Sequence, residues 1–359
     1  MISAWETSFG EEEIEHVVRS LRNKHVSQGK VTEEFEGLLS SYLHVENVVA
    51  VSSGTSALTI ALMSLGVGPG DEVILPNRTW IATAHAVHIL GAKAVLVDVE
   101  DGRPIIDVSQ IVKKITPRTR VIMPVHMNGR SADMREITKI AKKHKLAVVE
   151  DSAQAIGSQN ADGFLGTQSD IGCFSLSVAK TISTGQGGFA VTNNKKLAER
   201  MRAIRTHGVE NVNDPSDWVM PGFNFRFPDI LASIGIEQLK RLPERIKQLR
   251  DIYITYRQGL ENSKFHLIPV NLDAGEVPVY NEFLIDNRDQ WVDRLESIGI
   301  KTRPFYPDMS NAPYLQQTEE IFPNSERYCK NGIYLPSGPC QQLSSINKCI
   351  NNIRSLSLR

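Results

Sequence analysis

Several features that would assign a protein to a large functional class are missing from this 359-residue sequence. The net charge is only -1 at pH 7, which gives no general attraction to nucleic acid or to anionic lipid. No uninterrupted apolar run approaches the roughly 20 residues that span a bilayer. The N-terminal stretch, MISAWETSFGEEEIE, is acidic and lacks the basic-then-apolar pattern of a signal peptide. We therefore expect a cytoplasmic protein that has neither nucleic acid nor a membrane as a partner.

Metal-binding and nucleotide-binding patterns are also scarce. The four cysteines contain no C-x-x-C pair, and we interpret them as reduced packing residues rather than metal ligands. Cys340 and Cys349 are the pair that could bridge or bind a metal, but we expect no metal site. The phosphate-binding patterns G-x-G-x-x-G and G-x-x-x-x-G-K-[ST] do not occur, which disfavours dinucleotide and P-loop sites.

What the sequence does contain, from residue 48 to residue 205, is an alternation of short β-branched apolar runs with helical patterns. This alternation predicts an α/β fold with a largely parallel sheet buried between helical layers. We expect strands at 48–51, 72–75, 94–98, 120–125, 146–150, 171–176 and 188–192. The expected helices are 55–65, 81–90, 108–115, 134–144 and 195–205.

Two amphipathic helices are expected before the first strand. In the first, residues 10–23, the apolar positions Ile14, Val17, Val18 and Leu21 share one face. In the second, residues 32–43, Thr32 is expected to cap the start.

The composition changes after the last expected helix. The polar and aromatic stretch 207–228 is too long for a plain connector and is therefore predicted to be functional. A helical stretch at 229–260, kinked at Pro243, would lead into a second domain with a strand at 282–285 and helices at 290–299 and 344–356. We expect a large domain of residues 1–240 and a smaller C-terminal α/β domain of residues 241–359.

An acid and a lysine mark the candidate site. Asp151 follows an apolar strand, at the carboxyl edge of a parallel sheet where α/β folds place ligands. Lys180 follows the small and apolar run CFSLSVA, which would desolvate its amine and lower its pKa. Together they fit a pyridoxal phosphate site, with the lysine holding the cofactor as a Schiff base and the carboxylate keeping the ring nitrogen protonated. Taken singly, Asp151 could be a magnesium-binding or surface acid and Lys180 an exposed lysine.

The run Ser52-Ser53-Gly54-Thr55-Ser56 lies where a strand gives way to a helix. Free backbone N–H groups and the positive end of a helix dipole at such a place suit a phosphate. Simple N-capping explains this run equally well on its own, and only its combination with Lys180 favours phosphate.

Three further side chains stay ambiguous on the residues alone. Trp80 is either a core aromatic, which is the safer interpretation, or a ring stacked on a flat cofactor. Gln154 either reaches the ligand or is a polar helix residue. His207 is a candidate substrate residue, although a lone histidine is more often structural.

Taken together, the ordered motifs resemble the DegT-type sugar aminotransferases, which are pyridoxal phosphate enzymes of fold type I. The resemblance runs from the N-terminal helix almost to the C-terminus. The motifs that carry it are SSGTSAL, PGDEVILP, VVEDSAQAIGS, FSLSVAKTISTGQGGFAVTNN, PGFNFRF, IGIKTRPFYP and GIYLPS. Family members that act as sugar dehydratases have histidine where Lys180 stands, so the chain resembles the transaminating branch.

The resemblance implies a role for each matched residue. Lys180 would bind pyridoxal 5'-phosphate and shuttle the proton, Asp151 would pair with the ring nitrogen, Gln154 would lie near the phenolic oxygen, and Trp80 would stack on the ring. The residues implied to hold the phosphate are Gly54, Thr55, Ser56 and Ser175, together with Asn224 from the neighbouring subunit of a homodimer with shared sites. Arg226 is implied to meet the amino donor's carboxylate or the sugar.

The implied reaction moves an amino group from glutamate to a keto-sugar in cell-surface polysaccharide biosynthesis. TRPFYP and GIYLPS resemble enzymes that aminate C4 of nucleotide-linked 4-keto-6-deoxysugars. The alternatives are a keto-sugar without a nucleotide, such as a keto eight-carbon acid sugar, another pyridoxal phosphate enzyme such as a desulfurase or aldolase, and a non-catalytic regulatory protein of the same fold.

Overall fold

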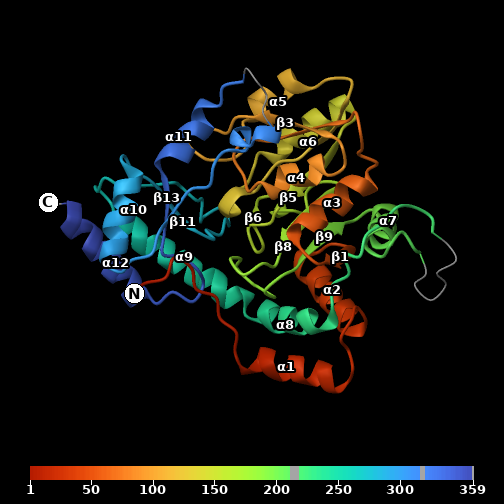
Figure 1. Ribbon diagram of the computed structural model, residues 1–359, viewed down its shortest axis with the longest axis horizontal. Coiled ribbons are helices and arrows are strands. Elements are labelled where there is room, and N and C mark those ends of the chain that lie inside the picture. Colours follow the sequence, from red (N-terminus) through yellow and green to blue (C-terminus); the bar gives the residue numbers. More distant parts are fainter. Residues whose placement is uncertain (211–217, 316–319, 358–359) are drawn as a thin grey trace.

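A seven-stranded sheet lies at the centre of the computed structural model, which describes residues 1–210, 218–315 and 320–357 (Figure 1). In spatial order the strands are β1 (Asn47–Val51), β9 (Gly188–Thr192), β8 (Ile171–Ser175), β5 (Ala147–Asp151), β4 (Thr119–Ile122), β2 (Glu72–Pro76) and β3 (Lys93–Val97). The five strands from β8 to β3 run parallel, and β9 is antiparallel to both of its neighbours. The predicted α/β fold with a largely parallel sheet is confirmed.

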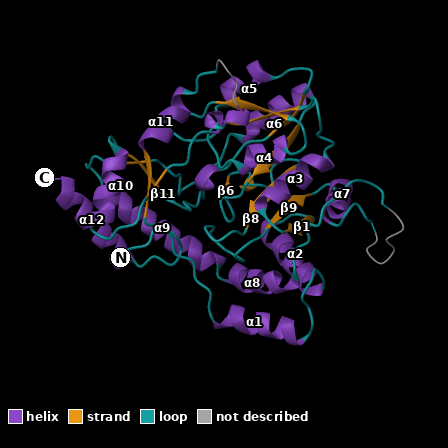
Figure 2. Cartoon of the chain, viewed as in Figure 1, coloured by secondary structure: helices purple, strands orange, loops and turns teal. Residues whose placement is uncertain are grey.

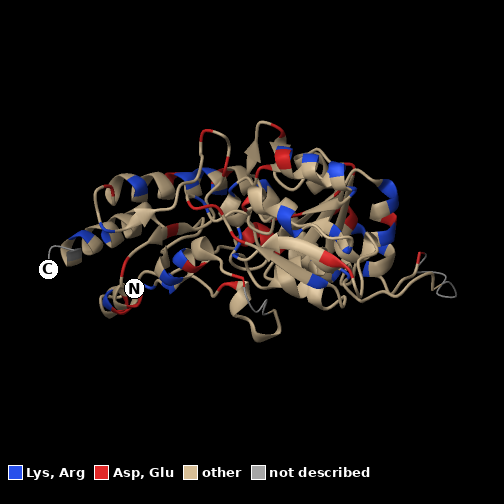
Figure 3. Cartoon of the chain, turned by 90° about the horizontal axis from the view of Figure 1, so that it is seen from above, with Lys and Arg blue, Asp and Glu red and all other residues tan. Residues whose placement is uncertain are grey.

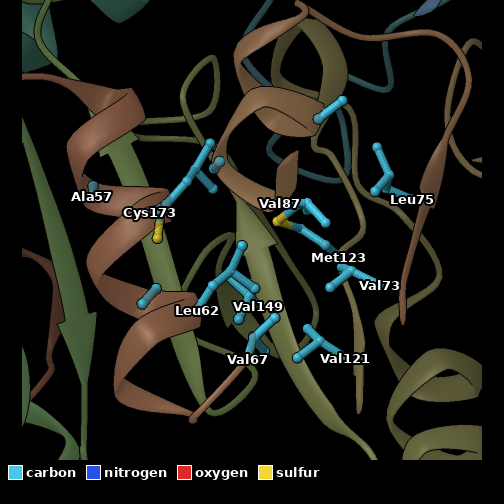
Figure 4. Close-up of a cluster of buried hydrophobic side chains, with 14 of the residues drawn as sticks. Ala57, Leu62, Val67, Val73, Leu75, Val87, Val121, Met123, Val149 and Cys173 are labelled. Carbon is cyan, nitrogen blue, oxygen red and sulfur yellow. The ribbon is translucent and has the colours of Figure 1, made fainter. Parts of the chain in front are cut away.

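Both faces of this sheet are buried, because successive strand residues point to opposite sides. In β2, Val73 and Leu75 join one apolar cluster with α3 (Gly54–Ser64), α4 (Ala82–His88) and α7 (Lys195–Arg205), as Figure 4 shows for part of this cluster. Ile74, between them, joins a cluster on the other face with α5 (Val108–Lys114) and α6 (Met134–His144). Helices therefore cover the sheet on both sides (Figure 2).

A second, smaller sheet is built from the C-terminal part of the chain. Its strands are antiparallel and lie in the order β10 (His266–Leu267), β11 (Asn281–Leu284), β13 (Gly332–Leu335) and β12 (Arg303–Pro304). The other elements around it are α10 (Arg288–Ser297), α11 (Pro323–Asn331) and α12 (Leu343–Ser357). The N-terminal residues reach this sheet too, since Ile2 bridges Ile300 and Trp5 bridges Ser337. The division at residue 240 stays a prediction.

The expected kinked helix over 229–260 is instead two helices, α8 (Asp229–Lys240) and α9 (Leu242–Gly259). Arg241 separates them, and Pro243 lies in the first turn of α9. A proline is tolerated there because the N–H groups of a first turn have no intrahelical partner. The sequence also gave no hint of the short hairpin β6 (Gln159–Asn160) and β7 (Gly163–Phe164).

The first helix, α1 (Glu11–Arg22), buries the face opposite to the expected one. Its buried residues are the polar Glu13, His16 and Ser20, and they face α8 through His16–Glu237 and Ser20–Ser233 hydrogen bonds. The apolar side chains Ile14, Val18 and Leu21 remain exposed. Among the described helices, none combines the length and the apolar character that crossing a membrane requires. Basic and acidic residues are interspersed over the outer helices (Figure 3).

The start of α2 (Lys30–Leu43) is also capped differently from the prediction. Thr32 lies inside the helix, and the cap comes from Asp229, almost two hundred residues away. The buried Asp229 carboxylate accepts hydrogen bonds from Gly29 N (2.8 Å), Thr32 N (2.9 Å) and Thr32 Oγ1 (2.7 Å). One side chain therefore fastens α2 to α8.

We predict that Asp229→Ala lowers the free energy of unfolding by about 3 kcal/mol, because it removes a helix cap and leaves buried N–H groups without an acceptor. Urea denaturation of the cofactor-loaded protein measures this change. The control is Asp289→Ala, whose side chain is 81% exposed and whose loss should change stability by less than about 0.5 kcal/mol. Equal stabilities of the two variants would contradict the assignment of Asp229 as the cap.

Candidate active site

A cavity of about 350 Å³ opens at the carboxyl ends of β5 and β8 and the N-terminus of α3. This is the edge of the sheet where α/β folds bind ligands. Eight residues singled out from the sequence line it: Ser53, Gly54, Thr55, Trp80, Asp151, Gln154, Ser175 and Lys180. The fold therefore brings together side chains that are separated by more than a hundred residues in the sequence.

Asp151 is the last residue of β5 and is buried in the floor of this cavity. Its Oδ2 accepts a hydrogen bond from Thr83 Oγ1 at 2.8 Å, and its Oδ1 accepts one from Ala153 N at 3.1 Å. Burial raises the pKa of the Asp151 carboxyl, whereas these hydrogen bonds and the nearby Lys180 amine act in the opposite direction. A carboxylate held in this way has a fixed orientation and favours a cation, such as a protonated ring nitrogen, beside it.

Lys180 lies in the segment that follows β8 and lines the same cavity. Burial lowers the pKa of its amine to about 8, and Arg303 acts in the same direction while Asp151 opposes it. An amine with this pKa is partly unprotonated near neutral pH, which is the form that attacks a carbonyl carbon. The expectation of a desolvated lysine is consistent with this environment.

The N-terminus of α3 forms a donor-rich wall. Ser53 caps the helix by accepting a hydrogen bond from Ser56 N at 3.0 Å, so capping and anion binding occur at the same place. The N–H groups of Gly54 and Thr55 precede the first intrahelical hydrogen bond and are free for a ligand. A Cβ at Gly54 would approach the Ser175 Cβ to 2.9 Å, so glycine permits this helix to reach β8. The Ser56 side chain does not line the cavity; its hydroxyl bonds to Ser52 and Ser53.

Trp80 and Gln154 contribute the flat and the polar parts of the cavity. The Trp80 side chain is 55% exposed and contacts the Tyr306 ring edge-on, so the interpretation of Trp80 as a core residue is wrong. Gln154 is buried, and its Oε1 accepts a hydrogen bond from Asn128 N at 3.0 Å. This bond orients the Gln154 amide and leaves its N–H groups for other partners.

Three more candidate residues, besides Ser56, lie outside this cavity. Asn224 is exposed and Arg226 half-buried, on a segment that pairs with the edge strand β1, where Arg226 bridges Val51. The Arg226 Nε donates to Asn224 Oδ1 at 2.9 Å. His207 is exposed, with a left-handed backbone (φ 59°). The segment 207–228, which was predicted to be functional, includes residues 211–217, which fall outside the described residues.

Sequence reasoning missed several lining residues because they come from distant segments without a pattern of their own. Thr83, Tyr280, Tyr306 and Arg303 belong to this group. The segment of Tyr306 is fixed by a buried ion pair, in which Arg78 Nη1 donates to Asp308 Oδ1 at 3.0 Å. The Arg78 guanidinium also lies over the Phe305 and Tyr306 rings. TRPFYP was noticed only through the family resemblance, and its place in the cavity depends on tertiary packing.

The chain is similar to known proteins over nearly its whole length. Residues 7–354 match the model of the DegT/DnrJ/EryC1/StrS aminotransferase family. GDP-perosamine synthase from Caulobacter vibrioides is 35% identical over 319 residues, 87% of this chain and 86% of the relative. GDP-perosamine synthase from Escherichia coli O157:H7 is 32% identical over 99% of both chains. The solved PMP form of Spr1654 from Streptococcus pneumoniae has a TM-score of 0.93 at 25% identity and covers 100% of this chain and 99% of that chain.

The chain belongs to the DegT/DnrJ/EryC1/StrS aminotransferase family. It is a sugar aminotransferase of α/β fold type I, and its cofactor is pyridoxal 5'-phosphate.

The cavity of this aminotransferase fits that cofactor. The N-terminus of α3 and the Ser175 hydroxyl suit the phosphate, and the glycine at position 54 leaves room for a close backbone approach. The exposed Trp80 ring offers a flat surface, and the buried Asp151 carboxylate suits a protonated ring nitrogen. Lys180 supplies the amine. Each part of the cofactor thus has a chemically matched partner in one cavity.

We predict that Gly54→Ala weakens binding of pyridoxal phosphate about tenfold or more, because the added Cβ forces the α3 N-terminus away from Ser175. Absorbance titration of the cofactor-free protein gives the dissociation constant. Gly37→Ala is the matched control, since a Cβ there meets no atom within 4 Å. A Gly54→Ala protein that binds the cofactor as tightly as the control would contradict this account of the phosphate site.

The lowered pKa of Lys180 has its own test. In the cofactor-free protein, acylation of Lys180 should increase with pH and reach half of its limiting rate near pH 8, because only the neutral amine reacts. Mass spectrometry of the modified peptides, sampled from pH 6 to pH 11, reports this profile, with the exposed lysines as internal references. A midpoint near 10.5, the ordinary value, would show that the amine is fully solvated.

Proposed function

We propose that this enzyme transfers the amino group of glutamate to a nucleotide-linked 4-keto-6-deoxysugar during the biosynthesis of cell-surface polysaccharide. The observation that carries the proposal is the placement of Lys180, Asp151 and the α3 N-terminus around one cavity. The choice of sugar is supported by the GDP-perosamine synthases among the relatives and by the resemblance of TRPFYP and GIYLPS to enzymes that aminate C4.

Each side chain has a task in this reaction. When bound, pyridoxal phosphate supplies an electron-withdrawing ring that stabilises negative charge at the reacting carbon. Asp151, oriented by Thr83 and the Ala153 N–H, keeps the ring nitrogen protonated. Lys180 Nζ would remove the proton from the amine-bearing carbon of glutamate, and its lowered pKa suits it to act first as a base and then, once protonated, as an acid. The α3 N-terminus, Gly54, Thr55 and Ser175 hold the phosphate in place.

We also propose a homodimer with shared active sites. Asn224, the residue implied to reach a neighbouring subunit's phosphate, is exposed and does not line the cavity of its own chain. The exposed apolar residues Ile14, Val18 and Leu21 of α1 give the chain an additional surface that association would cover. A dimer therefore accounts for two features that a single chain leaves without a function.

A keto-sugar without a nucleotide, such as a keto eight-carbon acid sugar, is the second candidate acceptor. The cationic Arg303 in the cavity favours it, since an acid sugar carries a carboxylate. The amine form of the enzyme should be mixed with nucleotide-linked keto-sugars whose sugar ring carries no charge, with uncharged free keto-sugars and with acidic keto-sugars. Return of the absorption of the aldehyde form identifies the acceptor. Failure of every keto-sugar to restore this band would contradict the proposed function.

We predict that Lys180→Ala abolishes the visible absorption of the covalently bound cofactor and lowers transamination by about 10³-fold or more, because both covalent attachment and proton transfer are lost. Absorption spectra and a coupled assay for 2-oxoglutarate measure the two effects. Lys195→Ala, which changes an exposed lysine of α7, is the control and should keep both properties. A Lys180→Ala protein with wild-type turnover would exclude the proposed role.

A further inference from the structure

Three charged side chains line the cavity among the described residues: Asp151, Lys180 and Arg303. The first two have assigned tasks toward the cofactor. Arg303 has none, and the sequence did not single it out. It is a cation that faces the place where substrates must react, so its function requires a separate explanation.

The fold holds Arg303 in a defined position. It belongs to β12, where it pairs with Tyr334 of β13, and its Cζ lies 4.9 Å from the centroid of the Tyr334 ring. A guanidinium over an aromatic face is attracted by the ring and keeps its N–H groups available to other partners. The Arg303 side chain is nevertheless exposed to solvent and lines the cavity. Its charged group is therefore positioned by the protein and open to a ligand.

No acidic side chain neutralises Arg303 within the described parts of the chain. The neighbouring arginines differ in this respect, since Arg78 is paired with Asp308 and Arg130 with Glu282, and both pairs are buried. Arg303 is instead close enough to Lys180 to lower the pKa of that amine further. Two cations beside each other in a half-enclosed cavity repel, and an anion between them relieves this repulsion.

We propose that Arg303 binds a substrate carboxylate next to the reacting carbon, and that this carboxylate is the α-carboxylate of the amino donor. The assignment rests on the proposed function. In an α-amino acid, the carboxylate is bonded to the same carbon as the amine, so a carboxylate site must lie close to Lys180. The planar guanidinium can donate two parallel hydrogen bonds to one carboxylate.

Arg226 is the alternative cation, since it was implied to meet the donor or the sugar. Within its own chain it lies on the edge of the large sheet, its Nε is already bonded to Asn224, and it does not line the cavity. It reaches a donor only from a partner subunit. Arg303 requires no partner, and the two residues therefore make different predictions.

Binding of 2-oxoglutarate to the aldehyde form of the enzyme tests the proposal without turnover, because two carbonyl compounds do not transaminate. We expect Arg303→Met to weaken this binding about tenfold to 100-fold in calorimetry, and Arg303→Lys to weaken it less. Arg294→Met is the matched control, since Arg294 also lies over an aromatic ring, that of Trp291, in α10. Unchanged cofactor absorption in each variant shows that the site is assembled.

The position of the carboxylate is tested with a second donor. Glutamate in which the α-carboxylate is replaced by an amide should react equally with wild type and Arg303→Met, whereas glutamate itself should react about tenfold to 100-fold more slowly with the variant. If Arg303→Met reacts more slowly than wild type by the same factor with glutamate and with its amide, the α-carboxylate assignment is wrong. If Arg226→Met loses 2-oxoglutarate affinity and Arg303→Met does not, the proposal is overturned.

The second half of the reaction, in which the amine form of the enzyme gives its amino group to a keto-sugar, decides which substrate supplies the carboxylate that Arg303 binds. If Arg303→Met loses amination rate only with an acidic keto-sugar and binds 2-oxoglutarate normally, Arg303 still binds a carboxylate, but that of the acceptor. If Arg303→Met aminates uncharged and acidic keto-sugars at the same rates as wild type but binds 2-oxoglutarate more weakly, the carboxylate that Arg303 binds belongs to the donor. If wild type aminates no keto-sugar but Arg303→Met still weakens 2-oxoglutarate binding, the proposed function fails and the carboxylate site stands.

Discussion

The electrostatic attraction between the buried Asp151 carboxylate and the Lys180 amine is the interaction on which the active site depends. Asp151 is buried and Lys180 is half-buried in the cavity wall, and burial favours the neutral form of both groups. Their mutual attraction, with hydrogen bonds to Asp151 from Thr83 and the Ala153 N–H, limits this effect. The result is a carboxylate that can stay charged beside a ring nitrogen and an amine that can lose its proton near neutral pH.

The scaffold explains how these groups meet. The parallel strands place Asp151 and Ser175 at one sheet edge, because the carboxyl ends of parallel strands lie together. The α3 N-terminus reaches the same edge, and the absence of a side chain at Gly54 permits contact with Ser175. Arg303 of the small sheet and Tyr306, in the loop that follows β12, also line the cavity. The residues assigned to the cofactor thus lie around the large sheet, and the arginine proposed to bind a substrate carboxylate lies on the small one.

Local sequence patterns predicted the large sheet well, because strands buried on both faces are short apolar runs whose ends are visible in the sequence. All seven strands were placed correctly apart from shifts at their ends. The same reasoning was wrong for α1, since periodicity identifies an apolar face but does not say whether the folded chain buries it. It was also wrong for the cap of α2, because Asp229 lies in another helix. Long-range hydrogen bonds of this kind leave no local pattern.

The sequence by itself determined the α/β class and predicted both the Asp151–Lys180 pair and a phosphate site at the start of a helix, because each depends on residue type at the end of a strand or the start of a helix. Only the tertiary structure decided that Trp80 faces the cavity, that Asn224 and Arg226 lie outside it, and that Arg303 stands beside Lys180. These facts depend on how segments far apart in the chain pack against each other. That packing is a property of the whole folded molecule, and no single stretch of residues specifies it.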